Sequence, residues 1–254
     1  MKEDALSGQH ALITGGGSGI GLASAAALAA AGARVSICGR NRKRLQSAAK
    51  GNRIFPVAMD VCDEQSVRNA VSMAVAENGP VNIHVANAGI AESCGFDEMS
   101  LPFWHRIMMT NLDGAFVSIR ESLLSMRTES WGWIITIASV AGLRGLKRAS
   151  AYTASKHGLV GLARALSEEL IGSGITANAI CPGYVDTPIL AKSVKEIAAR
   201  SGKSEQDALA ALLRLNRDRK LIDPHEVAAT ALWLCLSGSE GMNGQVFPIS
   251  GGQV

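Results

Sequence analysis

Short apolar runs alternate with longer amphipathic or alanine-rich segments along the whole chain of 254 residues. Glycine or polar residues follow these runs, as expected for strands buried in a parallel sheet. The predicted strands are His10–Thr14, Ala33–Cys38, Ile54–Met59, Val81–Ala86, Trp133–Ala138, Gly174–Cys181 and Gln245–Ile249.

The segments between the strands have the composition and end signals of helices. Leu22–Ala31 is rich in helix formers and stops at Gly32, and Asp223 with Pro224 caps a helix that runs to Leu236. Other predicted helices are Glu64–Glu77, Leu101–Met126, one containing Tyr152 and ending near Ile171, and two within residues 188–216. This unbroken alternation predicts an α/β fold: one Rossmann-type, doubly wound parallel sheet of about seven strands with helices on both faces.

Composition and charge narrow the class of protein. Hydrophobic residues make up 47% and charged residues 19%, which suits a buried core, and a net charge of +3 without blocks of like charge disfavours nucleic-acid and membrane partners. Five scattered cysteines without C-x-x-C fit reduced thiols better than disulfides or a metal site. The N-terminus is not a signal peptide and no run reaches transmembrane length, so we expect a cytoplasmic protein.

The first strand runs into a glycine-rich loop. Residues 14–21 read Thr-Gly-Gly-Gly-Ser-Gly-Ile-Gly, and a helix follows directly. Glycines between a strand and a helix let backbone N–H groups approach a pyrophosphate, although the strict G-x-G-x-x-G spacing is missing and glycines also serve tight turns. The glycine loop therefore predicts a phosphate-binding site. Because the alternation of strands and helices has no linker-like break, we expect one dinucleotide-binding catalytic domain over residues 1–254. Ser201-Gly202 divides the helical stretch at about 188–216 into two helices, which we expect to form a mobile substrate flap.

The second strand ends in Gly39 and Arg40. An NAD-binding loop of this kind usually carries a carboxylate there for the adenosine ribose, whereas a guanidinium can pair with the 2′-phosphate of NADP. This predicts a preference for NADP(H). The alternative is that Arg40 stacks on the adenine or faces solvent, which leaves NAD(H) usable.

The stretch from Ser139 to Lys156 carries the candidate chemistry. Tyr152 and Lys156 are four residues apart, so on a helix they share one face, and an ammonium beside a phenol lowers the pKa of that phenol. Such a tyrosine exchanges a proton near neutral pH. Ser139 follows a buried strand, where its hydroxyl can donate to a carbonyl oxygen. A lone Y-x-x-x-K pair is common, so its value as evidence for catalysis depends on the motifs that precede it in the chain.

Three further positions follow the same logic. Asn87-Ala88-Gly89 and the Pro182–Thr187 loop both stand at strand ends, where an open α/β sheet binds ligands. Asn111 stands inside a predicted helix, which is unfavourable unless its amide has a partner. The alternative for Asn111 is a solvated helix face.

In this order and spacing, T-G-x-x-x-G-x-G, N-A-G, Asn111, Ser139, Y-x-x-x-K and P-G-x-x-x-T resemble the short-chain dehydrogenase/reductase family over residues 10–252. The resemblance implies a reversible ketone–alcohol conversion with a nicotinamide cofactor. It implies Asn111, Ser139, Tyr152 and Lys156 as catalytic residues, of which Ser139 and Tyr152 also bind substrate. The implied cofactor-binding residues are Gly15, Ser18, Gly19, Ile20, Gly21, Arg40, Asp60, Val61, Asn87, Ala88, Gly89, Tyr152, Lys156, Pro182, Gly183, Val185 and Thr187.

The resemblance also gives each catalytic residue a role. Tyr152 is the general acid/base, Lys156 lowers the pKa of Tyr152 and binds the nicotinamide ribose, and Ser139 polarises the carbonyl. Asn111 holds a water that links Lys156 to solvent, and Thr187 contacts the carboxamide. A homotetramer is expected on the same basis.

The substrate class stays open between a 3-oxoacyl thioester such as an acyl-CoA and a small or alicyclic ketone. The segment 178–213 is similar to 3-hydroxybutyrate and 3-hydroxyacyl dehydrogenases, but Ala141 stands where hydroxybutyrate dehydrogenases carry a carboxylate-binding histidine. Ser130 and Ser173 replace the basic residues with which carrier-protein reductases dock, which disfavours that partner. Arg144, Lys147 and Arg148 are candidate anion contacts or an exposed basic loop.

Two other hypotheses remain at the sequence level. One is an NAD-linked alcohol or sugar dehydrogenase that works oxidatively. The other is a binding protein that senses the cofactor and has lost the chemistry.

Overall fold

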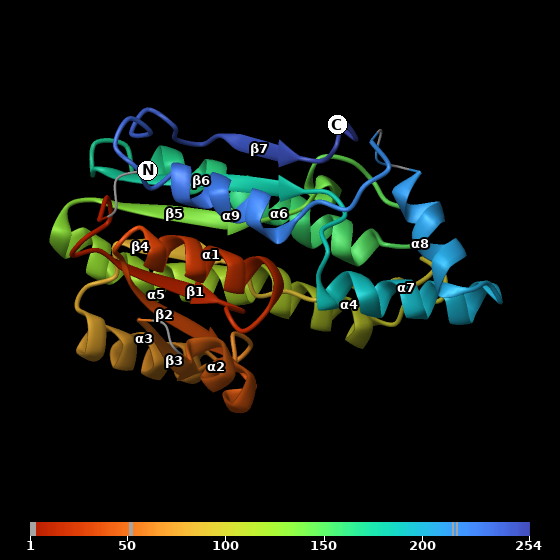
Figure 1. Cartoon of the computed structure of the whole chain (residues 1–254), viewed down its shortest axis with the longest axis horizontal. Coiled ribbons are helices and arrows are strands. Elements are labelled where there is room, and N and C mark those ends of the chain that lie inside the picture. The colour runs from red at the N-terminus through yellow and green to blue at the C-terminus, as the bar shows by residue number, and fades with distance from the viewer. Residues whose placement is uncertain (1–3, 51–52, 215, 217) are drawn as a thin grey trace.

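The computed structural model describes residues 4–50, 53–214, 216 and 218–254. One seven-stranded sheet forms its centre, with the strand order β3-β2-β1-β4-β5-β6-β7 and parallel pairing throughout (Figure 1). The strands are β1 His10–Thr14, β2 Arg34–Gly39, β3 Ile54–Ala58, β4 Ile83–Ala86, β5 Gly132–Ile137, β6 Ile175–Pro182 and β7 Val246–Ile249. The predicted fold class is confirmed, with strand ends shifted by one or two residues.

Proline residues stand in both edge strands. Pro56 lies in β3 and Pro248 in β7. Each of these two strands pairs with a neighbouring strand on one side only. Proline has no N–H to give to a further strand, so both edges resist extension of the sheet.

Helices cover both faces of the sheet. They are α1 Gly19–Ala30, α2 Arg42–Ala49, α3 Glu64–Asn78, α4 Leu101–Met108, α5 Gly114–Glu129, α6 Ser150–Glu169, α7 Pro188–Ser201, α8 Glu205–Leu213 and α9 Pro224–Trp233. Helices α1 and α9 share one hydrophobic cluster with the sheet, whereas α3, α5 and α6 share another. Within β1, Ile13 belongs to the first cluster and Leu12 to the second, as the alternation of side chains along a strand requires.

The predicted helix Leu101–Met126 is interrupted. Residues Met109–Asp113 form a π-helical turn between α4 and α5. Asn111 lies in this turn and is fully buried, so the alternative of a solvated helix face is wrong. Such turns are rare and are often found at functional sites.

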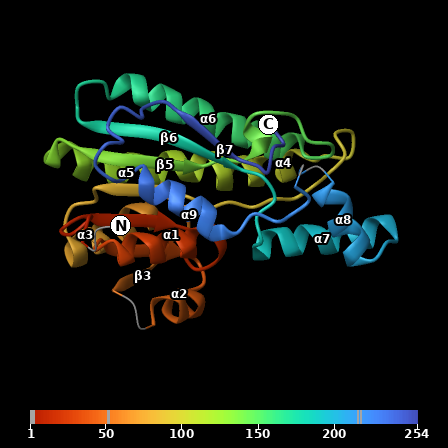
Figure 2. The ribbon, with the colours of Figure 1, turned by 45° about the horizontal axis from the view of Figure 1, so that its top comes forward.

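Helices α7 and α8 project from the end of the molecule at which the strands terminate (Figure 2). They have a small hydrophobic cluster of their own, built on Val194, Ala198 and Ala208. The break between them is at Gly202, which adopts a left-handed conformation as the C-cap of α7. The prediction of two helices within residues 188–216 is therefore confirmed. No helix in the described part of the chain is both long and apolar enough to cross a membrane.

Two histidines are buried in the strands. His10 in β1 bonds through Nδ1 to the Gly79 carbonyl at 2.7 Å and through Nε2 to Ser36 Oγ at 2.8 Å. His84 in β4 bonds to the hydroxyl of Ser122 on α5 at 2.8 Å. Burial lowers the pKa of His10 to about 4 and that of His84 to about 3. Both side chains are therefore neutral in the folded protein at neutral pH.

Because these histidines are buried in the neutral form, we expect the folded protein to be less stable in acid. Their folded pKa values lie below the ordinary value of 6.5, so their stabilising effect is complete above pH 6.5 and declines as the pH falls toward the folded values. At pH 5 each should lower the free energy of unfolding by about 2 kcal/mol relative to pH 8. Urea unfolding at several pH values measures this, and His84→Gln should flatten the slope. The exposed His157→Gln is the control; equal slopes in wild type and His84→Gln would contradict the account.

Candidate active site

One cavity of about 640 Å³ lies at the carboxyl ends of the strands. Residues from the glycine loop, from the ends of β2, β4, β5 and β6, and from α6 and α7 line it. Of the predicted site residues, all but Gly21 and Asn111 are in its lining. The structure thus brings together residues that are up to 172 positions apart, from Gly15 to Thr187.

The glycine loop is tied to the end of β4. Thr14 Oγ1 accepts hydrogen bonds from the backbone N–H groups of Asn87 and Ala88, both at 3.0 Å. The amide of Asn87 donates in return to the carbonyls of Thr14 at 2.9 Å and Gly15 at 3.2 Å. Asn87 therefore caps backbone carbonyls of the loop, a role that a strand-end asparagine beside small residues can take.

The glycines of the loop leave no room for side chains. A Cβ on Gly21 would lie 2.5 Å from both the Asn87 amide nitrogen and the Gly15 carbonyl oxygen, and one on Gly19 would lie 3.0 Å from Thr187 Cγ2. Helix α1 begins at Gly19, and Gly15, Gly17 and Gly19 line the cavity beside its N-terminus. This cradle fits a pyrophosphate group, because backbone N–H groups and the helix dipole favour an anion there.

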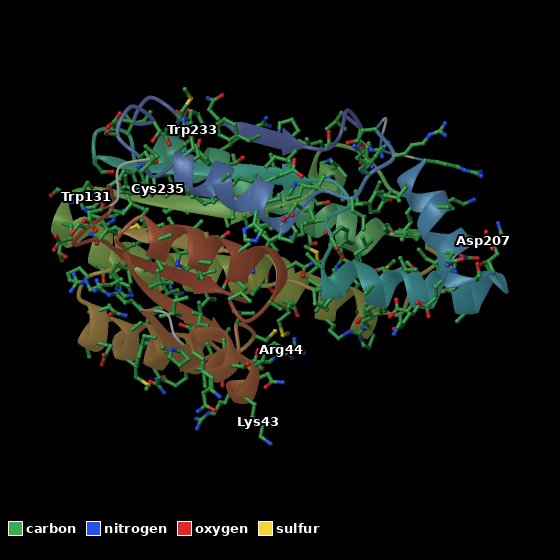
Figure 3. The ribbon with its side chains drawn as sticks, in the orientation of Figure 1. Lys43, Arg44, Trp131, Asp207, Trp233 and Cys235 are labelled. Atoms are coloured by element: carbon green, nitrogen blue, oxygen red, sulfur yellow. The ribbon has the colours of Figure 1, made fainter. Side chains whose placement is uncertain are left out.

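Two arginines lie at the far end of the cavity. Arg40 follows β2 and is exposed, and Arg44 in the first turn of α2 also lines the cavity. A Cβ on Gly17 would lie 3.3 Å from Arg44 Cγ, so the arginine stem lies against the glycine loop. In Figure 3, by contrast, Lys43 points away from the body of the molecule. Arg44 was not among the predicted site residues, although it stands only four positions after Arg40.

Ser139 and Tyr152 meet on the opposite side of the cavity. Ser139 follows β5, is 8% exposed, and accepts a hydrogen bond from the Ala141 N–H at 3.1 Å. Burial raises the pKa of the Tyr152 phenol above its ordinary value, and a hydrogen bond with Ser139 offsets part of this rise. Both residues line the same cavity, where their hydroxyls can contact a bound ligand.

Lys156 is buried one helical turn from Tyr152. Its ammonium donates to the Ile137 carbonyl at 2.8 Å and lies 5.7 Å from the centre of the Tyr152 ring. Burial lowers the pKa of Lys156 to about 8. The lowered pKa that we expected for Tyr152 is thus not found. Burial of the phenol dominates, and the lysine, which is itself buried, points its ammonium at a backbone carbonyl.

Asn111 lies just behind the cavity. Its amide accepts from the Ile90 N–H at 2.8 Å and donates to the Ile90 carbonyl at 3.0 Å and to Ser155 Oγ at 3.1 Å. A Cβ on Gly89 would lie 3.3 Å from Asn111 Oδ1 and 3.7 Å from Lys156 Nζ, so Asn111 and Lys156 flank this glycine. The π-helical turn thus pins the segment after β4 against α6.

Other predicted positions are also accounted for. Thr187 Oγ1 lines the cavity and caps α7 by accepting from the Leu190 N–H at 3.4 Å. Of the three basic candidates, Arg148 pairs with Glu98 at 2.8 Å and Arg144 donates to Gln253 at 3.3 Å. Lys147 is the member of this trio that lines the cavity.

The fold and this cavity define a doubly wound α/β protein with a nucleotide-sized cleft at its topological switch point. A family model described as short chain dehydrogenase matches residues 9–198. A D-beta-hydroxybutyrate dehydrogenase of Cupriavidus necator is 34% identical over 255 residues, covering 98% of this chain and 99% of that protein.

Solved structures agree with these matches. A variant of actinorhodin polyketide ketoreductase, solved with NADPH, is 32% identical with a TM-score of 0.94 and covers 99% of each chain. A levodione reductase structure is 31% identical with a TM-score of 0.92 and covers 98% of each chain. The chain belongs to the short-chain dehydrogenase family and is an oxidoreductase that acts on CH–OH groups.

The close contacts around the glycine loop predict what a single added methyl group at Gly21 would do. Gly21→Ala places its Cβ against Asn87 and Gly15, so it should destabilise the fold by about 1–3 kcal/mol and weaken NADPH binding. Gly161→Ala is the matched control, because a Cβ at this position in α6 meets nothing within 4 Å and should stabilise by about 0.5–1 kcal/mol. Urea unfolding and a fluorescence titration with NADPH measure both. Wild-type behaviour of Gly21→Ala would contradict the packing described.

Proposed function

We propose that this protein reversibly reduces a ketone to a secondary alcohol with a nicotinamide cofactor, and that Tyr152 is the general acid/base. The observation that carries the proposal is the convergence of Ser139 and Tyr152 on one cavity wall, with buried Lys156 behind them. A 3-oxoacyl thioester or a small or alicyclic ketone is the substrate class.

Each residue has a distinct task in this scheme. Since Ser139 Oγ already accepts from the Ala141 N–H, its O–H is directed to donate to the carbonyl oxygen. The raised pKa keeps the Tyr152 phenol protonated at neutral pH, which is the form that supplies the proton in ketone reduction. Lys156 places a positive charge beside the phenol and stabilises it when that proton has left. A bound nicotinamide supplies or accepts the hydride.

The alternatives are less well supported. A binding protein that had lost the chemistry would have lost one of the hydroxyl or ammonium groups or closed the cavity, yet Ser139, Tyr152 and Lys156 all line it. Oxidation of an alcohol by the same residues is the reverse reaction, so an NAD-linked alcohol or sugar dehydrogenase differs from our proposal chiefly in cofactor and direction.

Removal of a single hydroxyl tests the role of Tyr152. Tyr152→Phe keeps the ring but cannot donate a proton, so kcat for ketone reduction should fall by about 10²–10⁴-fold or more. NADPH affinity, measured by cofactor fluorescence, should change little and shows that the cavity has kept its shape. Wild-type turnover in this variant would refute the assigned role.

A preference for NADP(H) is supported by the pair of arginines at the adenosine end. Arg40 and Arg44 both line the cavity there, and neither has a carboxylate partner among the described ion pairs. Two guanidinium groups provide charge-assisted hydrogen bonds to a 2′-phosphate. The solved ketoreductase relative contains NADPH, which is consistent with this preference.

Charge reversal at this end should change the cofactor preference. Arg40→Asp and Arg44→Asp should each raise the KM for NADPH about tenfold or more, because a charged hydrogen bond is replaced by repulsion, and should affect the KM for NADH far less. Arg42→Asp is the control, since Arg42 lies in the same helix turn but outside the cavity lining. Equal effects on the two cofactors would contradict the proposed phosphate site.

We also infer a homo-oligomer, with a tetramer as the expected form, and a cytoplasmic location. Large apolar side chains are exposed along α4 and α5 and in the turn between them, namely Leu101, Met109, Phe116 and Leu124. Exposed apolar residues that share one helical element support contact between copies of the chain.

A further inference from the structure

Two carboxylates line the substrate side of the cavity. Glu92 lies in the segment that follows β4, and Glu196 lies in α7. The chain brings them together from 104 positions apart, because α7 packs over the segment after β4. Neither residue belongs to the catalytic set or to the cofactor end of the cavity.

The cations that balance these carboxylates lie outside the cavity lining. Lys192 Nζ is 3.4 Å from Glu92 Oε1 and 3.5 Å from Glu196 Oε1, so one ammonium lies between the two acids. Arg106 also pairs with Glu92. The Lys192 and Arg106 side chains are 60% and 50% exposed, against 21% for Glu92 and 38% for Glu196. Both acids line the cavity, and neither base does.

The network also fixes the flap on the body of the protein. Besides the Lys192–Glu92 pair, Arg200 of α7 donates to Ser93 Oγ at 2.8 Å. Burial raises the pKa of Glu92, but hydrogen bonds and attraction from Arg106 and Lys192 together hold it below its ordinary value. Glu92 is therefore ionised at neutral pH.

The rest of this end of the cavity offers little to an anion. Its other lining residues are largely apolar, including Leu146, Ile189, Leu190, Ile197 and Leu212. The basic side chains nearby are mostly engaged elsewhere, as described above for Arg144 and Arg148. Lys147 is exposed and offers one solvated charge at the rim.

We infer that Glu92 and Glu196 determine specificity by disfavouring a carboxylate next to the reacting ketone, so that the enzyme takes ketones whose neighbouring group is an uncharged ester, thioester or ring, and discriminates against free oxo acids. This inference rests on the proposed function. A substrate carboxylate in the cavity would approach the two lining glutamates more closely than their partners Lys192 and Arg106, which are outside the lining, so repulsion would exceed attraction. The chain would then differ in substrate class from the hydroxybutyrate dehydrogenases that it resembles in sequence.

Matched acid and ester pairs test the inference. Acetoacetate is compared with methyl acetoacetate, and 4-oxocyclohexanecarboxylate with its methyl ester, with NADPH oxidation as the readout. The members of each pair carry the same ketone and differ mainly in charge. Wild-type kcat/KM should favour each ester by about tenfold or more. High salt should narrow the ratio, because screening weakens repulsion.

Substitutions in the network should move this ratio in opposite directions. Glu196→Gln and Glu92→Gln each remove one negative charge and should narrow the ester-to-acid ratio. Lys192→Met removes the ammonium between the acids and should widen it, which mere loosening of the flap would not produce. Glu205→Gln removes the same charge from α8 outside the cavity lining and is the control.

The outcomes separate this inference from the proposed function. Equal kcat/KM for acid and ester, or a ratio that stays unchanged in Glu196→Gln and Lys192→Met, overturns the discrimination against free oxo acids while ketone reduction stands. Turnover of the acids in preference to the esters overturns it as well. Turnover of none of the four compounds also counts against this substrate class, and only the absence of turnover on a wider ketone panel would count against ketone reduction itself.

Discussion

The parallel pairing of β1 with β4 is the constraint on which the site depends. To one side of this pair the strand order runs β1-β2-β3, and to the other it runs β4-β5-β6-β7, so the connections diverge and leave a crevice at the carboxyl ends. Thr14 and Asn87 stand at the ends of these two strands and bond to each other's backbone. The glycine loop and the N-A-G segment are therefore set relative to each other by the sheet itself.

Burial decides the protonation states around the reacting hydroxyls. The charge of an ammonium one helical turn away lowers the pKa of a phenol. Here desolvation outweighs that effect, and it raises the pKa of Tyr152 and lowers that of Lys156. Both shifts favour the uncharged forms, and both groups remain able to exchange a proton. The arrangement suits an acid that delivers its proton to a substrate oxygen rather than a permanently ionised phenolate.

Most of the fold could be predicted from the sequence, and most of the predicted site residues line the cavity, because both follow from local rules. Apolar runs ended by glycine predict buried parallel strands, and residues just after such strands must lie at one edge of the sheet. This placed Ser139 and Asn87 at the site. The π-helical turn around Asn111 could not be predicted, since it depends on the bonds of that amide to Ile90 and Ser155, which are distant in sequence. The predicted direction of the pKa shift of Tyr152 was also wrong, because spacing along a helix says nothing about desolvation.

The substrate end of the cavity follows a different rule. Glu92 and Glu196 carry no motif and lie near each other only because α7 packs on the segment after β4. The proposed catalytic residues, by contrast, lie just after β5, in the π-helical turn and in α6. Under the proposed function, proton transfer and substrate selection are thus assigned to separate parts of the fold. A change in the charges of α7 is then expected to alter which ketone is accepted while the hydroxyls of Ser139 and Tyr152 keep their places.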